Sequence, residues 1–269
     1  MASAQEAVTF SVILPAYNEQ DRILPYLTSI ARHLSQRGDP YEIVIVDDGS
    51  RDETAQQVTR FALDAPAVRL IRLPANRGKG AAVRAGMLAA RGRLRLMADA
   101  DGATPIQEVE RLERALAAGA DVAIGSRFLA SRDHRYRVQA RWHRTVLGNL
   151  FNRIAQHLGL HGITDTQCGF KLFRKRAAED LFSVARIDGY GFDLEVLYVA
   201  RRRDYRIAEI PINWTDQPGS KVRVIRDGVR MYRELLAVRR HDAQGLYRRD
   251  GTSDRIGELP EASQSHTYS

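Results

Sequence analysis

The fold of this chain is decided by one stretch, Leu94-Arg95-Leu96-Met97-Ala98-Asp99-Ala100-Asp101-Gly102-Ala103-Thr104-Pro105. Apolar side chains alternate along residues 94–98, which is the period-2 pattern of a strand. Two carboxylates, Asp99 and Asp101, follow this strand directly. Thr104 then suits the N-cap of a helix, and Gln107 stands at the capping-box position three residues later. The stretch therefore predicts a strand, an acidic turn and a capped helix.

The two carboxylates of this turn indicate a metal site. Asp99 and Asp101 are separated by one residue, so their charges repel unless a cation lies between them. Mg²⁺ and Mn²⁺ take oxygen ligands and share them with substrate phosphates. A solvated acidic turn is the alternative, and it is the commoner explanation of an isolated Asp-x-Asp triplet. The rest of the chain favours the metal site.

Length and composition indicate a globular α/β protein. The 269 residues, of which 44% are hydrophobic, suffice for one large domain or two small ones. No apolar run approaches the roughly 18 to 20 residues that cross a bilayer. The N-terminus has no basic region followed by an apolar one, so we expect no secretory signal. The single cysteine, Cys168, cannot form an intrachain disulfide, and no Cys and His cluster indicates zinc. We therefore expect a cytoplasmic protein.

The charge of the chain points to anionic partners. The net charge is +8 and the pI is near 9.9, and most of the basic residues are arginines. Nucleic acid, anionic lipid and phosphorylated substrates all fit this charge. A nucleic-acid-binding protein is not expected, because the chain has no basic and aromatic stacking motif and no recognisable reading helix.

Strand and helix patterns alternate through the first half of the chain. Strands are predicted over residues 10–14, 42–46, 68–73, 94–98 and 121–125, with helical patterns between them. This order is typical of a Rossmann-like, mostly parallel sheet with helices on both faces. The chain contains no Gly-x-Gly-x-x-Gly and no Walker lysine motif, so a dehydrogenase or a P-loop NTPase is poorly supported.

Polar residues gather after the predicted strands, at the edge where such sheets bind ligands. They are Asn18, Glu19, Asp47, Asp48, Asn76, Arg77, Lys79, Asp99, Asp101, Ser126 and Arg127. Ordinary turns predict polar residues at both ends of the strands. They do not predict this concentration of carboxylates and cations at one end.

The second half of the chain is rich in arginine. Residues 127–153 carry seven arginines beside a helical apolar stripe, and residues 224–238 form a second amphipathic pattern. Strands are predicted over 169–174 and 206–214, and the second is expected to be an edge strand or an irregular one because it contains Pro211. Aliphatic residues thin out after His241, so we predict a disordered tail over residues 241–269.

Four motifs in this order resemble the inverting GT-A glycosyltransferases of family 2. The motifs are Pro15-Ala16-Tyr17-Asn18-Glu19, Val46-Asp47-Asp48-Gly49-Ser50, Asn76-Arg77-Gly78-Lys79-Gly80 and Asp99-Ala100-Asp101. Residues 97–105, 166–173 and 189–193 are most similar to the dolichyl-phosphate β-glucosyltransferases, which are polyprenyl-phosphate sugar synthases. The resemblance covers about residues 8–239.

This resemblance implies a GT-A fold in a single catalytic domain over residues 1–240. The nucleotide-sugar half would span 8–125, and an acceptor half with basic helices would span 126–240. The chain departs from its relatives in two ways. It lacks the membrane helix with which the eukaryotic enzymes begin. Ala103 stands where mannosyl relatives carry a glutamine. The sequence therefore does not identify a third side-chain ligand to the metal.

The resemblance also implies a donor site. The implied donor-binding residues are Pro15, Ala16, Tyr17, Glu19, Asp47, Asp48, Asn76, Gly78, Lys79, Asp99 and Ala100. Asp99 and Asp101 would bind Mg²⁺ or Mn²⁺, which neutralises charge on the departing nucleoside diphosphate. Lys79 would approach the diphosphate or the base at a helix N-terminus, where anions are favoured. The alternatives are helix or turn capping for Asp47 and Asp48, and a solvated charge for Lys79.

For the acceptor, the resemblance and the residue types point to a lipid monophosphate. Its second pKa is about 6, so it is a nucleophile at pH 7 without a general base. The residues expected to hold this phosphate are Arg127, Arg144, Ser220 and Lys221. Asp193 is the candidate base if one is used, and capping of the following helix is its alternative role. Asp101, Arg127 and Asp193 are therefore the candidate catalytic residues.

Together these inferences predict an enzyme that transfers glucose from UDP-glucose to dolichyl or undecaprenyl phosphate with inversion. We expect it to bind peripherally to an anionic membrane surface on the cytoplasmic face, or to dock on a membrane-spanning partner. Two alternatives keep the fold and change the substrates. One is a GDP-mannose-dependent polyprenyl-phosphate mannosyltransferase, and the other is a GT-A transferase with a soluble acceptor.

Overall fold

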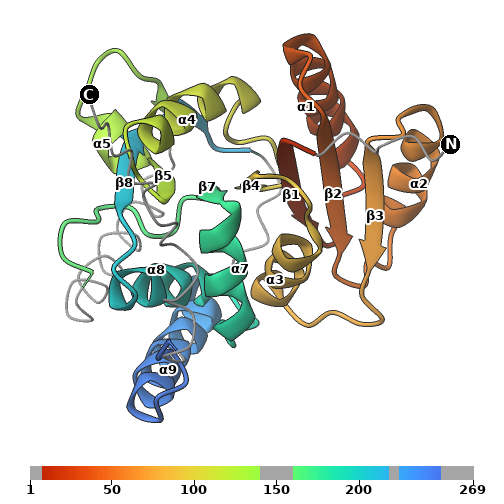
Figure 1. The fold of residues 1–269 in the computed structure, drawn as a ribbon. Coiled ribbons are helices and arrows are strands. Elements are labelled where there is room, and N and C mark those ends of the chain that lie inside the picture. Colours follow the sequence, from red (N-terminus) through yellow and green to blue (C-terminus); the bar gives the residue numbers. More distant parts are fainter. Residues whose placement is uncertain (1–7, 140–159, 218–223, 250–269) are drawn as a thin grey trace, which may run out of the picture.

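A seven-stranded sheet forms the centre of the protein (Figure 1). The computed structural model describes residues 8–139, 160–217 and 224–249. The sheet order is β3-β2-β1-β4-β7-β5-β8. The strands are β1 Phe10–Ala16, β2 Tyr41–Asp47, β3 Val68–Arg72, β4 Leu94–Ala98, β5 Val122–Ser126, β7 Phe170–Arg174 and β8 Ile207–Pro211. A separate pair joins β6 Val138–Gln139 to β9 Trp214–Thr215 in parallel.

The sheet is parallel except for β7, which runs antiparallel between β4 and β5. The register pairs Ala98 at the end of β4 with Phe170 at the start of β7. Because β7 runs the other way, the residues before it lie beside the carboxyl ends of its neighbours. The predicted edge strand is also confirmed, since β8 is outermost and ends at Pro211.

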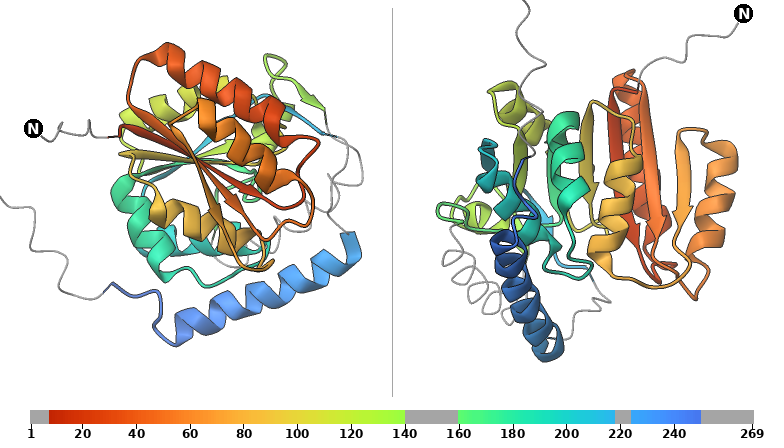
Figure 2. Two further views of the ribbon diagram at one scale, coloured as in Figure 1. Left: turned by 90° about the vertical axis from the view of Figure 1, so that its right-hand side faces the viewer. Right: turned by 60° about the horizontal axis from the view of Figure 1, so that its bottom comes forward.

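Helices cover both faces of the sheet (Figure 2). One face carries α1 Ile23–Arg37, α2 Thr54–Asp64 and α4 Val109–Ala117. The other carries α3 Lys79–Ala89, α7 Lys175–Val184 and α8 Phe192–Arg202, with α9 Val224–Ala243 packed outside α8. The short α5 Arg127–Ser131 follows β5 directly. This layered arrangement is the one that the strand and helix alternation predicts.

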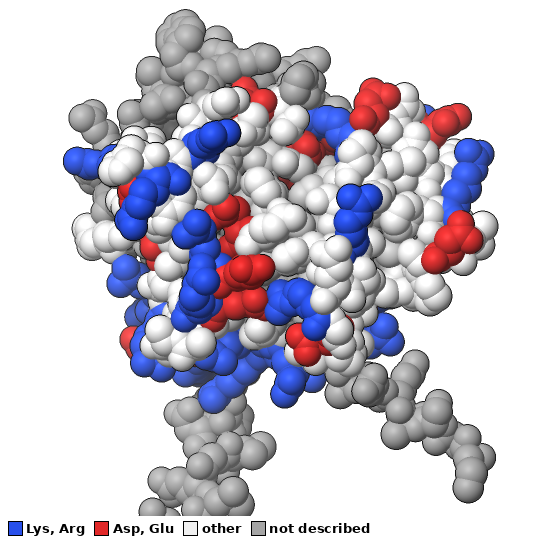
Figure 3. All heavy atoms as spheres, turned by 90° about the horizontal axis from the view of Figure 1, so that it is seen from above, with Lys and Arg blue, Asp and Glu red and all other residues white. Residues whose placement is uncertain are grey.

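Many of the charges on the surface are paired. Figure 3 shows acidic side chains directly beside basic ones over much of one face. Buried charges are paired as well. Glu42 at the start of β2 has a side chain that is 1% exposed. It accepts hydrogen bonds from the Ser11 hydroxyl at 2.7 Å, the Arg91 backbone N–H at 2.5 Å and the Arg69 Nε at 3.0 Å. Burial opposes ionisation of Glu42, but these donors together lower its pKa.

Glu42→Gln is expected to lower the free energy of unfolding by about 1 to 3 kcal/mol at pH 7, because the amide cannot accept from all three donors. A carboxyl group with a lowered pKa stabilises the fold above its ordinary pKa, and this contribution is lost as the pH falls through the folded value. The gap between wild type and variant should therefore narrow below about pH 4. Urea unfolding between pH 7 and pH 3.5 measures it, with exposed Glu53→Gln as the control. A gap that does not change with pH would contradict the assignment.

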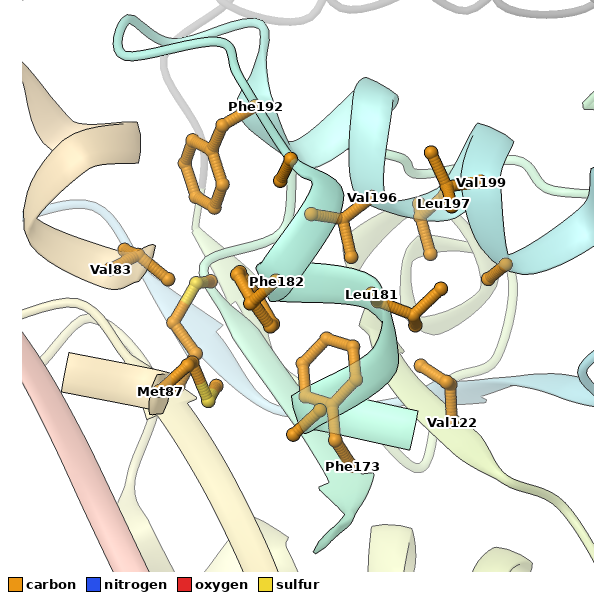
Figure 4. Packing of buried hydrophobic residues seen from close by; sticks show 14 of the residues in the cluster. Val83, Met87, Val122, Phe173, Leu181, Phe182, Phe192, Val196, Leu197 and Val199 are labelled. Carbon is orange, nitrogen blue, oxygen red and sulfur yellow. The ribbon is translucent and has the colours of Figure 1, made fainter. Parts of the chain in front are cut away.

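The core beneath α3, α7 and α8 draws on both halves of the chain (Figure 4). Val83 and Met87 of α3 point toward Phe182 of α7. The rings of Phe173 and Phe182 meet edge to face, with centroids 5.4 Å apart. Such buried aromatic pairs stabilise a core beyond the area that they bury. The packing therefore fixes α3, which begins at Lys79, relative to β7 and α8.

The capped helix predicted after Asp101 is not formed as expected. The segment continues as a 3-10 turn over Ile106–Glu108, and neither this turn nor α4 has a side-chain cap. Asp101 Oδ1 instead accepts the Ala103 N–H at 3.0 Å. The Thr104 carbonyl accepts the Tyr26 hydroxyl at 2.9 Å. The prediction was wrong because the acidic turn is closed by its own carboxylate and by a tyrosine from α1.

The prediction of disorder from residue 241 is wrong for residues 241–249. Helix α9 continues to Ala243, and Tyr247 is fully buried. Its hydroxyl donates to Glu195 Oε1 at 2.6 Å, and Arg203 Nε donates to its carbonyl at 2.9 Å. One aromatic ring and one buried arginine therefore order residues 241–249, which the low aliphatic content did not reveal. Residues 250–269 and the apolar stripe over 142–158 lie outside the described residues.

Candidate active site

The candidate site is built from the loops that follow the carboxyl ends of the parallel strands. Asp99 is the first residue after β4, and its backbone N–H donates to the Gly169 carbonyl at 3.0 Å. A Cβ at position 169 would overlap the Asp99 carboxylate, so any other residue here would displace that side chain. The segment before β7 therefore fixes the backbone and restricts the side chain of Asp99.

The Asp99 carboxylate faces a lysine. Lys79 Nζ lies 2.5 Å from Asp99 Oδ1, and it also lies over the Phe192 ring at 5.9 Å. The contact is an ion pair without hydrogen-bond geometry. Asp99 Oδ1 is buried, and no described residue gives it a hydrogen bond. Burial opposes the charge of Lys79, but the Asp99 and Asp193 carboxylates raise its pKa, so the lysine stays protonated.

Asp101 lies on the same turn and carries the second carboxylate. Its Oδ2 is 3.9 Å from a guanidinium nitrogen of Arg22, and Glu19 holds that arginine through two 2.7 Å hydrogen bonds. Burial and the neighbouring Asp99 charge both raise the pKa of Asp101. The two carboxylates therefore repel each other, as the sequence predicted, and a cation near both would relieve this repulsion.

The two carboxylates fit a divalent cation that takes further ligands from a substrate. Asp99 Oδ1, which has an ion pair with Lys79 but no hydrogen bond, and the carboxylate of Asp101 supply the oxygen donors that Mg²⁺ and Mn²⁺ prefer. Among the described residues, no group of three or more His, Cys, Asp or Glu side chains could hold a metal. The alanine at 103 adds no ligand atom. Two protein carboxylates plus phosphate oxygens is a common arrangement for Mg²⁺.

The N-terminus of α3 does not offer the free N–H groups that an anion site needs. The Gly80 and Ala81 N–H groups both donate to the Asp188 carbonyl, at 2.8 and 3.2 Å. Gly78 has φ +116°, and a Cβ there would overlap this same carbonyl. These two N–H groups are therefore not available to an anion, and the approach of Lys79 to the diphosphate stays a prediction. An anion here would meet the Lys79 ammonium instead.

Asp47 and Asp48 bind backbone groups, which favours the capping alternative. Asp47 Oδ1 accepts the Ser50 N–H at 3.0 Å, and its Oδ2 lies 3.2 Å from Arg72 Nε. Both oxygens of Asp48 accept backbone N–H groups, from Arg77 and Gly78, each at 2.8 Å. Asp48 therefore shapes the loop before Lys79, and its carboxylate is already engaged.

The remaining predicted donor residues lie on neighbouring loops. Ala16 is buried at the end of β1, and its carbonyl accepts the Asp48 N–H at 2.8 Å. Pro15 and Tyr17 beside it are partly exposed, as is Glu19. Asn76 is exposed, and its backbone packs closely against Gly49. Ala100 is buried between the two carboxylates. The structure thus brings these loops together at one edge of the sheet.

Arg127 is held rigidly at the end of β5. Its guanidinium forms two hydrogen bonds with Asp165, at 2.8 and 2.7 Å, and its backbone N–H makes a third at 2.9 Å. The face of the guanidinium stacks on Trp214, 5.4 Å from the ring centroid. Burial opposes ionisation of Asp165, but Arg127 outweighs it and lowers the pKa of this carboxyl. The arginine is therefore a fixed cation that is partly exposed.

Asp193 lies in a buried ion pair. Its Oδ1 is 2.5 Å from Lys171 Nζ, and the same ammonium donates to the Cys168 carbonyl at 2.6 Å. The side chains of Lys171 and Asp193 are 1% and 6% exposed. Helix α8 has Gly191 at its N-cap and no side-chain cap, so Asp193 does not cap it. Cys168 is buried, as expected, and burial raises the pKa of its thiol to about 12.

Two residues of the site were missed at the level of sequence. Lys171 interrupts the apolar strand Phe170-Lys171-Leu172-Phe173, and a charge within such a run signals a buried partner. Asp165 gave no signal of its own, because its partner Arg127 is 38 residues away. Arg144, Ser220 and Lys221, which were predicted to hold the acceptor phosphate, lie outside the described residues.

Comparisons with known sequences cover most of the chain. Residues 11–182 match the family model described as Glycosyl transferase family 2. The chain is 39% identical over 243 residues to a dolichyl-phosphate beta-glucosyltransferase of Trichomonas vaginalis, covering 87% of this chain and 72% of the relative. Proteins of the same name from Saccharomyces cerevisiae and Homo sapiens are each 38% identical, covering 90% of this chain and 78% of the relative.

Solved structures share the architecture. Glucosyl-3-phosphoglycerate synthase from Mycobacterium tuberculosis, in complex with Mn²⁺ and UDP-glucose, has a TM-score of 0.59 at 20% identity, covering 86% of this chain and 77% of that one. Mannosyl-3-phosphoglycerate synthase from Rubrobacter xylanophilus has a TM-score of 0.62 at 20% identity, covering 94% and 79%. At these identities the likeness concerns the fold alone, and the predicted GT-A fold is confirmed.

Proposed function

Because the chain belongs to glycosyl transferase family 2, we propose that it transfers glucose from UDP-glucose to a polyprenyl phosphate, with inversion at the sugar. The chain is a glycosyltransferase by family. Relatives named dolichyl-phosphate beta-glucosyltransferase, at 36–39% identity over most of their length, support the sugar and the acceptor class. The observation that carries the proposal is the pair of carboxylates, Asp99 and Asp101, beside the ammonium of Lys79.

In this proposal each residue of the site has a role. Asp99 and Asp101 would hold a Mg²⁺ or Mn²⁺ ion, which would stabilise negative charge on the departing UDP. Lys79 supplies a second positive charge at the same place. Arg127, which Asp165 and Trp214 hold in place, would bind the acceptor phosphate through its guanidinium. A phosphate with its second pKa near 6 attacks as a dianion, which agrees with the engagement of Asp193 by Lys171.

The two alternatives from the sequence keep the same site. The fold does not select the sugar, because a glucosyl and a mannosyl synthase both share it at 20% identity. Both of those enzymes are named for 3-phosphoglycerate, a soluble phosphate compound. The relatives at 36–39% identity favour glucose and a dolichyl-type lipid, so we rank these substrates first.

A substrate panel tests the proposal. Purified protein is given radiolabelled UDP-glucose or GDP-mannose, with dolichyl phosphate, undecaprenyl phosphate or 3-phosphoglycerate as acceptor. We expect label in the lipid fraction from UDP-glucose alone. Calorimetric titration with UDP and GDP provides the second measurement. Tighter binding of GDP, or label only in 3-phosphoglycerate, would reject the assigned substrates.

We further propose that the enzyme binds peripherally to anionic membranes on the cytoplasmic face. Of the helices that the structure describes, none is long and apolar enough to cross a membrane. The surface of α5 and the turn after it supports an interfacial contact. Phe128 is exposed there, Arg132 lies over its ring at 5.5 Å, and Arg137 is exposed nearby. Each basic residue near an anionic leaflet contributes roughly 1 kcal/mol, screened by salt.

Flotation with anionic liposomes is expected to recover the wild-type protein at low salt and to lose it as salt rises. The variant Arg132→Gln with Arg137→Gln should bind about thirtyfold more weakly at low salt, because two juxtamembrane charges are removed. Arg60→Gln with Arg93→Gln makes the same charge change at exposed positions elsewhere. Failure of the wild type to float at low salt would favour a membrane-spanning partner or a soluble acceptor.

A further inference from the structure

Lys79 is placed where a divalent cation at Asp99 would lie. Its ammonium is 2.5 Å from Asp99 Oδ1, the oxygen that no described residue hydrogen-bonds. Mg²⁺ binds its oxygen ligands at about 2.0 to 2.1 Å, so such an ion and this ammonium cannot share one face of the same oxygen. Lys79 must therefore move before a cation can bind Asp99 at that face.

The surroundings of Lys79 keep it charged and close to Asp99. Lys171 neutralises Asp193, and Asp193 in turn lies near enough to Lys79 to favour its charged form. The Phe192 ring lies 5.9 Å from the ammonium, and the backbone of α3 at Gly80 is packed against Phe192. The charges thus alternate in sign from the buried Lys171 and Asp193 to the partly exposed Lys79 and Asp99. A lysine in such a row has a negative partner on both sides.

We propose that Lys79 stands in for the divalent cation at Asp99 while the donor is absent, and yields that position when cation and nucleoside diphosphate bind together. The displaced ammonium then binds the diphosphate. This inference rests on the proposed function, because it needs a metal-dependent nucleotide site. With Lys79 at Asp99, the divalent cation alone should bind weakly, since it must compete with a tethered ammonium. The cation and the nucleotide together should bind tightly, because the ammonium gains the diphosphate as a new partner.

Replacing Lys79 should change the affinities for Mn²⁺ and for UDP in opposite directions. In Lys79→Gln, Mn²⁺ alone should bind about three- to tenfold more tightly than in wild type, because its competitor is gone. UDP in the presence of saturating Mn²⁺ should bind about tenfold more weakly, because one charge contact to the diphosphate is lost.

Two further variants serve as controls. Lys79→Arg keeps the competing cation and should not raise the affinity for Mn²⁺. The exposed Lys175→Gln is the matched control and should change neither affinity. Titration calorimetry measures all four proteins.

A second measurement uses the wild-type protein. The chain has four lysines, Lys79, Lys171, Lys175 and Lys221, so ¹³C-dimethylation gives a spectrum that is simple to assign. The Lys79 signal, identified by its loss in Lys79→Arg, should shift on addition of Mg²⁺ with UDP. An unshifted signal would overturn the inference even if Lys79→Gln does not fold.

The outcomes separate this inference from the proposed function. If wild type binds UDP with Mn²⁺ but Lys79→Gln binds Mn²⁺ alone no more tightly than wild type, the role of Lys79 is overturned and the metal site stands. If wild type binds no Mn²⁺ even with UDP, the metal-dependent nucleotide site fails, and the proposed mechanism fails with it.

Discussion

Asp101→Asn is expected to lower turnover about a thousandfold while leaving the fold intact. The variant removes one of the two charges that would hold the cation beside the departing diphosphate. The asparagine side-chain carbonyl can still accept the Ala103 N–H, which closes the turn in the structure through Asp101 Oδ1. Asp101 is also partly exposed, so the change leaves no buried cavity. The loss should therefore appear in the chemistry and not in the free energy of unfolding.

Turnover of UDP-glucose and thermal unfolding should be measured together on this variant. Asp39→Asn is the matched control, because Asp39 is an exposed aspartate in the turn before β2. Wild-type enzyme in excess chelator should be as slow as Asp101→Asn. Full activity under chelation would reject the metal site, and near-normal turnover in the variant would remove Asp101 from it.

Local sequence patterns predicted most of the framework of this site. The strand at 94–98, the acidic turn after it and the edge strand that contains Pro211 all lie where their residue patterns placed them. These features depend on neighbours within a few residues, so alternation and turn chemistry are enough to reveal them. The sequence also predicted that the loops gather at one edge of the sheet, because the first strands were expected to run parallel.

The errors and omissions concern contacts between residues far apart in the chain. Asp188 occupies the N–H groups of α3 from a position more than 100 residues away, so the helix start appeared open to an anion. Tyr26 and Asp101 together replaced the expected cap at Thr104. The orientation of β7 between β4 and β5 also cannot be deduced from its own apolar run. Each of these is decided by tertiary packing, which overrides local preference.

The largest effect on stability is expected at the buried pair of Lys171 and Asp193. Lys171→Met or Asp193→Leu alone should lower the free energy of unfolding by about 3 to 5 kcal/mol, because each leaves a buried charge without its partner. The double variant should recover most of this loss, since it removes both charges from a site where they are 1% and 6% exposed. Urea unfolding of wild type, both single variants and the double variant completes the cycle.

The same double variant decides what Asp193 does in the reaction. If Asp193 only partners Lys171, the stable double variant should keep turnover within about tenfold of wild type, because a dianionic phosphate attacks without a base. The remaining loss would reflect the missing negative partner of Lys79 and the Cys168 carbonyl left without its lysine donor. A double variant that regains stability but stays inactive would show instead that the Asp193 carboxylate takes part in the chemistry. The ion pair seen in the structure favours the first outcome, since Lys171 already binds one oxygen of the Asp193 carboxylate.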